Sequence, residues 1–128
     1  MRLLLDTNAL LRWLSEQSKL SRAAWAAIQG PANEVFVSAA SAWEIATTQR
    51  IGKLTLSEDA IRSLPEDIEE AGFTFMDISF RQALLAGRLP ISLRDPFDRI
   101  IIAQAKSENM TVITSDRAFG GSGVSVIW

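Results

Sequence analysis

The sequence predicts an α/β fold with a mostly parallel central sheet, on three observations. Short apolar runs alternate with longer helical segments along the whole chain. Turn-forming residues such as Gly30-Pro31 and Pro90 separate these segments. No internal repeat, low-complexity stretch or linker divides the 128 residues. We therefore expect a single domain over residues 1–128.

The elements follow one another in a regular order. Strands are predicted over residues 2–6, 34–38, 73–77, 110–116 and 123–128. Helices are predicted from Asn8 onward and over residues 21–29, 39–50, 56–72, 79–90 and 95–109. Pro65 predicts a break in the helix over 56–72. In open parallel sheets, functional sites form where the strands end, so acids at strand ends are the first candidates.

Composition removes several classes of chemistry. The chain contains no His, Cys or Tyr, which excludes histidine bases, Ser-His-Asp triads, cysteine nucleophiles and zinc held by histidine or cysteine. Several carboxylates in one pocket repel one another unless a hard cation lies between them. An enzymatic interpretation of this composition therefore favours Mg²⁺ or Mn²⁺.

The net charge of −2 argues against a protein that coats nucleic acid non-specifically, although it leaves room for a local cationic patch. No apolar run approaches the roughly 18 residues that predict a membrane helix. The first ten residues lack the layout of a signal peptide. We therefore expect a cytoplasmic protein that does not enter the membrane.

Asp6 and Asp116 each follow an apolar run that predicts a buried strand. The carboxyl ends of parallel strands share one edge of the sheet, so these two acids are expected to lie close together. Glu44 lies in a helix of small and apolar residues, where helical spacing places it on one polar stripe with Ser41 and Thr48. The alternatives are that Asp6 and Asp116 only cap the next turn, and that Glu44 is solvated.

The segment RDPFDR predicts the start of a helix. Asp95 fits a helix N-cap and Pro96 fits the first helical position. Asp98 then lies in the first turn, near free N–H groups and at the rim of a buried segment. Capping alone accounts for Asp95, and interaction with the helix dipole is the alternative for Asp98. Together, Asp6, Glu44, Asp98 and Asp116 predict a site for divalent-metal phosphodiester cleavage.

The chain resembles the PIN-domain toxins of the VapC type, which belong to toxin–antitoxin pairs. Three segments carry the resemblance: LLLDTNALL at the start, VSAASAWEIATTQRIGKL in the middle, and RDPFDRIIIAQAKSENMTVITSDRAF followed by VSVIW at the end. The likeness runs nearly end to end and is weakest across residues 55–75. The ordered set of motifs is far more specific than any one of them.

The resemblance implies a three-layer α/β/α sandwich that cleaves RNA with Mg²⁺ or Mn²⁺. Asp6, Glu44, Asp98 and Asp116 match the family's catalytic and metal-binding acids. Asp95 matches an extra acid that binds metal or only caps its helix, and Asn8 and Thr114 match polar positions beside the metal. The family acts with a cognate antitoxin protein whose tail occupies the active-site groove, and its members usually form homodimers.

Several side chains leave two interpretations open. The candidates for RNA contact are Arg50, Lys53, Arg94, Arg99 and Arg117, by their nearness in sequence to the acids. Trp13 and Trp25 are either core residues or the lining of an apolar groove for a partner, whereas Trp43 is expected in the core. Trp128 is expected to pack where the last strand ends.

Two other functions compete with RNA cleavage. A phosphoacceptor or phosphatase-type α/β domain also places an Asp after its first strand, but Asn8 stands where a haloacid-dehalogenase-like site has its second Asp, and no Lys ends a strand. A non-catalytic PIN-like scaffold is the other alternative. Loss of one of the acids would favour it, and all four are present.

Overall fold

The computed structural model describes residues 1–128 and contains one sheet of five parallel strands in the order β3-β2-β1-β4-β5. The strands are β1 (Arg2–Leu5), β2 (Glu34–Ser38), β3 (Thr74–Met76), β4 (Thr111–Ile113) and β5 (Val126–Ile127). Because β1 pairs with β2 on one side and β4 on the other, the strand order reverses at β1. The carboxyl ends of β1 and β4 are therefore the expected place for a site.

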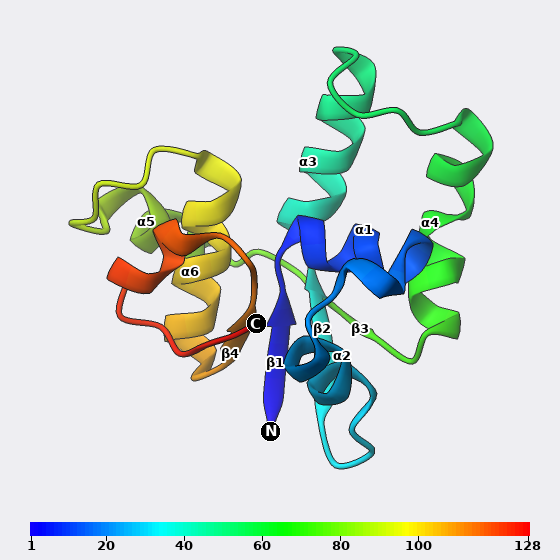
Figure 1. Cartoon of the computed structure of the whole chain (residues 1–128). Helices are drawn as coiled ribbons and strands as arrows, with labels where there is room; N and C mark the ends of the chain where they lie inside the picture. Colours follow the sequence, from blue (N-terminus) through cyan, green and yellow to red (C-terminus); the bar gives the residue numbers. More distant parts are fainter.

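Helices cover both faces of the sheet (Figure 1). They are α1 (Thr7–Ser15), α2 (Arg22–Gln29), α3 (Ala39–Arg50), α4 (Glu58–Glu70), α5 (Phe80–Arg88) and α6 (Pro96–Glu108), with the 3-10 turns η1 (Gln17–Lys19) and η2 (Arg117–Gly121). Helices α1, α2 and α4 pack on one face, and α5 and α6 on the other. No helix is long and apolar enough to cross a bilayer.

Strand β1 shows how the sequence builds two cores. Successive side chains of a strand point to opposite faces, so Leu3 and Leu5 join the core under α1, α2 and α4, whereas Leu4 joins the core under α5 and α6. All three are fully buried, and each burial stabilises the fold by roughly 1.5–3 kcal/mol. The predicted three-layer α/β/α sandwich is confirmed.

Each of the six α-helices begins at a Ser or Asp whose side chain accepts a backbone N–H from the first turn. Two of these caps, Asp6 and Asp95, are also candidate site residues. The capping interpretation therefore holds for both, and it leaves open whether they bind a cation as well.

Two expectations about local structure are wrong. Helix α4 runs through Pro65 without a break, because Pro65 is exposed and the carbonyl of Ile61 can bind water in place of the N–H that proline lacks. Trp43 was expected in the core but is 55% exposed, since Ala40, Ser41 and Ile45 take the buried positions of α3. Its ring packs edge-on against Phe97 instead.

Candidate active site

Asp6 follows β1 and is only 5% exposed. Its Oδ1 accepts the N–H of Ala9 at 2.8 Å, and its Oδ2 accepts the hydroxyl of Thr114, which follows β4. The two side chains meet because β1 and β4 are parallel neighbours. Thr114 Oγ1 also accepts the N–H of Asp116 at 3.0 Å. Thr114 thus positions the carboxylate of Asp6 and the backbone of Asp116 together.

Glu44 points from the middle of α3 toward the start of α1. Its Oε1 accepts the hydroxyl of Thr7 at 2.5 Å, and Thr7 is also hydrogen bonded to the hydroxyl of Ser41 at 3.0 Å. Ser41 and Thr7 are buried, whereas Glu44 is half-buried. Ser41 and Glu44 of the predicted polar stripe therefore face the start of α1, where Thr7 fixes the glutamate.

Helix α6 begins as the RDPFDR segment predicts. Asp95 Oδ1 accepts the N–H groups of Phe97 at 2.9 Å and Asp98 at 3.0 Å, and Pro96 occupies the first helical position. Asp98 lies half-buried in the first turn, and no donor contacts its carboxylate. Asp116 is exposed and caps η2 through the N–H of Ala118 at 2.9 Å.

The four other acids all act electrostatically on Asp98. Burial is the largest influence on the pKa of the Asp98 carboxyl, and the charges of Asp95, Glu44, Asp6 and Asp116 add to it, so that together they raise this pKa to about 7. All four of those charges act on Asp98, so the structure brings the predicted acids together. A carboxyl in such surroundings holds its proton far above its ordinary range.

Two of the other acids are also shifted. Burial is the largest influence on the pKa of Asp6 and of Glu44, and it raises both. Hydrogen bonds from Thr114 and Thr7, respectively, act in the opposite direction because they stabilise the charged form. The two threonines therefore offset part of the penalty for keeping these carboxylates ionised.

The donor set fits a hard divalent cation. The three ion pairs of the molecule, Arg2–Glu108, Lys19–Glu16 and Arg62–Asp59, include none of the five acids, so their negative charge has no cationic partner. Carboxylate oxygens are the ligands that Mg²⁺ and Mn²⁺ prefer. As the side chains stand, no three carboxylates gather close enough to hold an ion. The acids therefore form a loose cluster in which no three carboxylates converge on one point.

Arg99, expected to contact RNA, instead donates hydrogen bonds to backbone carbonyls of its own chain. Its Nε donates to the carbonyl of Ala86 at 2.9 Å, and its Nη2 to that of Leu89 at 2.7 Å. Its Nη1 donates to the carbonyls of Ile91 and Leu93. Every nitrogen of the guanidinium is therefore occupied, and Arg99 anchors the segment between α5 and α6.

The sequence interpretation missed two side chains beside the acids. Thr7 holds Glu44, and its only signal was its place directly after Asp6 at the start of a helix. Arg12 lies on α1, where its charge lowers the pKa of Asp6 and its Nη1 is 3.5 Å from the Ser115 hydroxyl. Asn8, expected beside the metal, is exposed in the first turn of α1 and makes no side-chain hydrogen bond to an acid.

A family model described as the PIN domain matches residues 3–121. The chain belongs to the PIN-domain family. The matched part of this PIN domain contains all five acids together with Thr7 and Thr114. No protein of curated function matches the sequence.

Solved structures share the fold of this PIN domain over its full length. VapBC2 from Rickettsia felis, bound to a promoter DNA fragment, matches with a TM-score of 0.70 at 17% identity, covering 99% of this chain and 98% of that one. FitAcB from Neisseria gonorrhoeae matches with a TM-score of 0.60 at 22% identity, covering 98% of this chain and 96% of that one. VapBC-5 from Mycobacterium tuberculosis, a toxin–antitoxin system, matches with a TM-score of 0.60 at 20% identity, covering 98% of this chain and 95% of that one. The expected resemblance to VapC-type PIN domains is confirmed.

Proposed function

We propose that this PIN domain is a divalent-metal-dependent endoribonuclease, the toxin of a toxin–antitoxin pair that acts in the cytoplasm. One observation carries the proposal: Asp98 lies in a cluster of five acids that make no ion pair, and burial together with the other four charges raises its pKa to about 7. A cluster of this kind favours a divalent cation. Membership of the PIN family supports nuclease chemistry at that cation.

Mg²⁺ or Mn²⁺ bound among the acids would supply an activated water and neutralise charge on the attacked phosphate. Asp6, Glu44, Asp98 and Asp116 are the residues that would hold it, with Asp95 as a further acid at the start of α6. Thr7 and Thr114 donate hydroxyl hydrogens that orient Glu44 and Asp6. Before a cation binds, the carboxyl oxygen of Asp98 holds a proton that it can release near neutral pH.

Cleavage of a pooled RNA preparation tests the activity. We expect cleavage with Mg²⁺ or Mn²⁺, none in EDTA, and none by Asp6→Asn in either buffer. End-mapping of cellular RNA after brief expression of wild type and Asp6→Asn would then identify the cleaved RNA. A wild-type protein that binds the metals but cleaves no RNA would instead be a non-catalytic scaffold.

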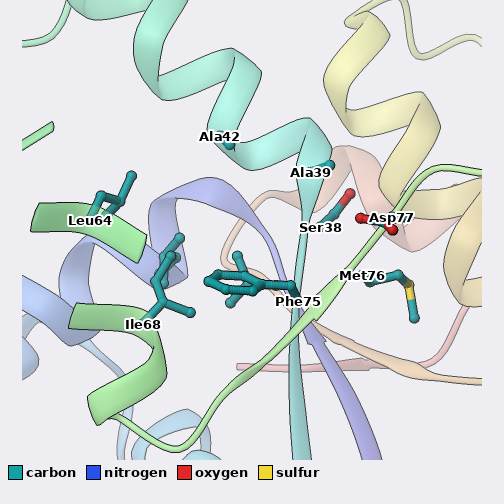
Figure 2. Close-up of a pocket in the computed structure, with 10 residues that line it drawn as sticks. Ser38, Ala39, Ala42, Leu64, Ile68, Phe75, Met76 and Asp77 are labelled. Atoms are coloured by element: carbon teal, nitrogen blue, oxygen red, sulfur yellow. The ribbon is translucent and has the colours of Figure 1, made fainter. Parts of the chain in front are cut away.

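The proposed protein partner is a cognate antitoxin, since the structures that share the fold include toxin–antitoxin complexes. Two apolar hollows run along α4. One of about 150 Å³ lies between α1 and α4 beside Leu11 and Leu14. The other, of about 220 Å³, lies where Leu64 and Ile68 face Phe75 of β3 (Figure 2). Leu64 lines both, so the two hollows lie next to each other along α4, and we refer to them together as the groove.

The groove has an acidic border. Exposed acids occupy the second half of α4, which has no basic residue in its last turn: Glu66, Asp67, Glu69 and Glu70. An apolar groove with this border fits an amphipathic helix with basic residues along its edge. Trp13 packs against Phe73, with ring centroids 5.9 Å apart, and so belongs to the core. The groove lies along α4 and not between the two N-terminal helices.

Substitution of one groove residue tests this surface. Leu14→Glu should weaken binding of the co-purified antitoxin at least tenfold in calorimetry, by about 1.4 kcal/mol or more, and leave RNA cleavage unchanged. Ile51→Glu, at an exposed position where α3 ends and outside both hollows, is the matched control. Equal antitoxin affinity in wild type and Leu14→Glu would place the partner elsewhere.

We also propose that the protein forms a homodimer. Phe80 and Leu84 of α5 are 86% and 57% exposed, and helical spacing places them on one stripe with Ala83 and Gly87. Ala83 and Gly87 share a hollow with Trp43, so the stripe continues across to α3 as one apolar surface. Sedimentation equilibrium should give a dimer for wild type and a monomer for Leu84→Asp.

A further inference from the structure

The largest hollow on the surface opens directly beside the acids. It has a volume of about 400 Å³, and its wall on the side of the acids consists of Thr114 and Asp116. Val126 and Trp128 line it from the β5 side. Because Thr114 also holds Asp6, the hollow adjoins the acidic cluster. A molecule in the hollow would lie next to the carboxylates.

Trp128 is held in a fixed position at this hollow. Its half-buried ring packs against the core under α1 and α2. On another side the guanidinium of Arg12 lies 5.2 Å from the ring centroid, and Arg12 also donates to Ser115 at 3.5 Å. An aromatic ring that is already fixed loses little conformational freedom when a flat ligand stacks on it, which favours binding.

The hollow also carries positive charge beside the acids. Arg117 lines it, is exposed, and makes no ion pair or side-chain hydrogen bond. Arg12 is likewise free of any ion pair. A guanidinium recognises phosphate through paired N–H donors. Within this one hollow the surface therefore changes from the carboxylate of Asp116 to the ring of Trp128 and the guanidinium of Arg117. Arg12 lies outside the lining, against the Trp128 ring.

We propose that this hollow is a nucleotide subsite that takes an unpaired base of the RNA next to the cleaved phosphodiester. The base stacks on Trp128, and the adjoining phosphate pairs with Arg117; an aromatic platform beside cations is how proteins bind single strands. The volume lies within the range of small-ligand sites. The inference rests on the proposed RNA cleavage, and it adds that bases locked in a duplex are excluded.

The first test is a pair of tryptophan variants. With a labelled RNA hairpin and Mg²⁺, Trp128→Leu should raise KM about tenfold, the loss typical of one base–aromatic stack, while kcat stays within about twofold. Trp128→Phe should retain most of the wild-type KM, since it keeps an aromatic face. Trp25→Leu, an exposed tryptophan on α2 outside the hollow, should match wild type. The same RNA annealed into a full duplex should be a poor substrate for all of them.

The second test uses an exposed residue and therefore does not depend on the fold of Trp128→Leu. Arg117→Ala should raise KM and reduce the slope of log KM against log salt concentration by about 0.7, the value for one phosphate contact on a single strand. A packing defect leaves this slope unchanged. Arg22→Ala, an exposed arginine at the start of α2, is the control.

The outcomes separate this subsite from the nuclease activity itself. Wild-type KM in both Trp128→Leu and Arg117→Ala would overturn the subsite and leave the nuclease intact. Weaker antitoxin binding with unchanged KM would assign the hollow to the protein partner and also overturn it. If wild type cleaves no RNA, photocrosslinking of 4-thiouridine RNA to Asp6→Asn decides: a crosslink on Trp128 supports the subsite, and its absence overturns it.

Discussion

Asp98 and Arg99 are neighbours on α6 with opposite charges, yet the structure uses them in opposite ways. The guanidinium of Arg99 donates to four backbone carbonyls and binds the segment after α5 to the helix. The carboxylate of Asp98 receives no hydrogen bond, and its pKa rises to about 7. Arg99, whose charge is satisfied by backbone carbonyls, contributes to stability. Asp98, whose carboxylate has no partner within the protein, is the candidate for binding a ligand.

The largest expected effect is on catalysis at Asp98. Asp98→Asn should lower kcat/KM about a thousandfold, because a cation ligand contributes several kcal/mol to transition-state stabilisation. The melting temperature should stay the same or rise, since one of several repelling charges is removed. Initial-rate measurements and thermal melting check the two parts. A variant that melts early and keeps its rate would make Asp98 structural.

Arg99→Met should show the reverse pattern. Four carbonyls lose their donor, so we expect the free energy of unfolding in urea to fall by about 3 kcal/mol. The cleavage rate per folded molecule should hardly change. Arg94→Met, at an exposed arginine of the same segment, should shift stability by less than about 0.5 kcal/mol. Lost activity in a fully folded Arg99→Met would contradict the division of roles.

Metal binding should stabilise the folded protein through Asp98 and not through Arg99. A cation that binds the folded state alone adds roughly 2.7 kcal/mol at a hundredfold excess over its dissociation constant. Mg²⁺ or Mn²⁺ should therefore raise the melting temperature of wild type relative to EDTA, and raise it much less in Asp98→Asn. Melting curves that do not move at millimolar metal would rule out the cation site.

Glu44 and Asp98 differ in that the hydroxyl of Thr7 donates a hydrogen bond to Glu44, whereas no group donates to Asp98. Removal of this hydroxyl tests what the difference contributes. Thr7→Val removes the hydroxyl that holds Glu44 and should lower metal affinity about tenfold, as is usual for a residue that orients a ligand. Thr7→Ser should restore it. Calorimetric titration with Mn²⁺ measures both, and Thr55→Val at an exposed site is the control. Equal affinity in Thr7→Val would leave the threonine a purely structural role.

Stability without metal should also depend on pH. The pKa of Asp98 is about 7 in the folded protein and 3.8 as its reference value, so the folded state holds a proton that the unfolded state releases between these values. The stabilisation is fully present below about pH 4 and is lost as pH rises to about 7. Melting temperatures in EDTA should fall over this window more steeply for wild type than for Asp98→Asn. Equal slopes would mean that Asp98 titrates normally.

The order and type of the main elements could be predicted because apolar runs and Ser or Asp caps mark them in the sequence. The strand over 34–38 and the helix over 39–50 have the predicted bounds. Strand β5 is only Val126–Ile127, within the predicted 123–128, because pairing with β4 and not hydrophobicity sets its length. The exposed position of Trp43 depends on which face of α3 packs against the start of α6, where Phe97 lies. This packing is not visible in the pattern of apolar residues along the sequence.

Four of the candidate acids could be predicted for the same reason, since they stand at a strand end or a helix start. Glu44, in the middle of α3, could be predicted instead from its place on a polar stripe among small and apolar residues. The partners of these acids could not be predicted. The bond from Thr114 to Asp6 joins positions 108 apart. Arg99 meets the carbonyl of Ala86 in α5 and three carbonyls of the segment that follows this helix. Nearness in sequence therefore pointed to Arg99 as a contact for RNA and gave no sign of Arg12. The metal-binding and catalytic roles of the acids remain predictions.

The bond between Asp6 and Thr114 also has a consequence for synthesis of the chain. Asp6 is made 108 residues before Thr114, and a domain of parallel strands must wait for such distant pairings. A nascent chain that does not yet include β4 thus has no assembled acid cluster. Any activity that depends on these acids together can begin only after β4 has been made.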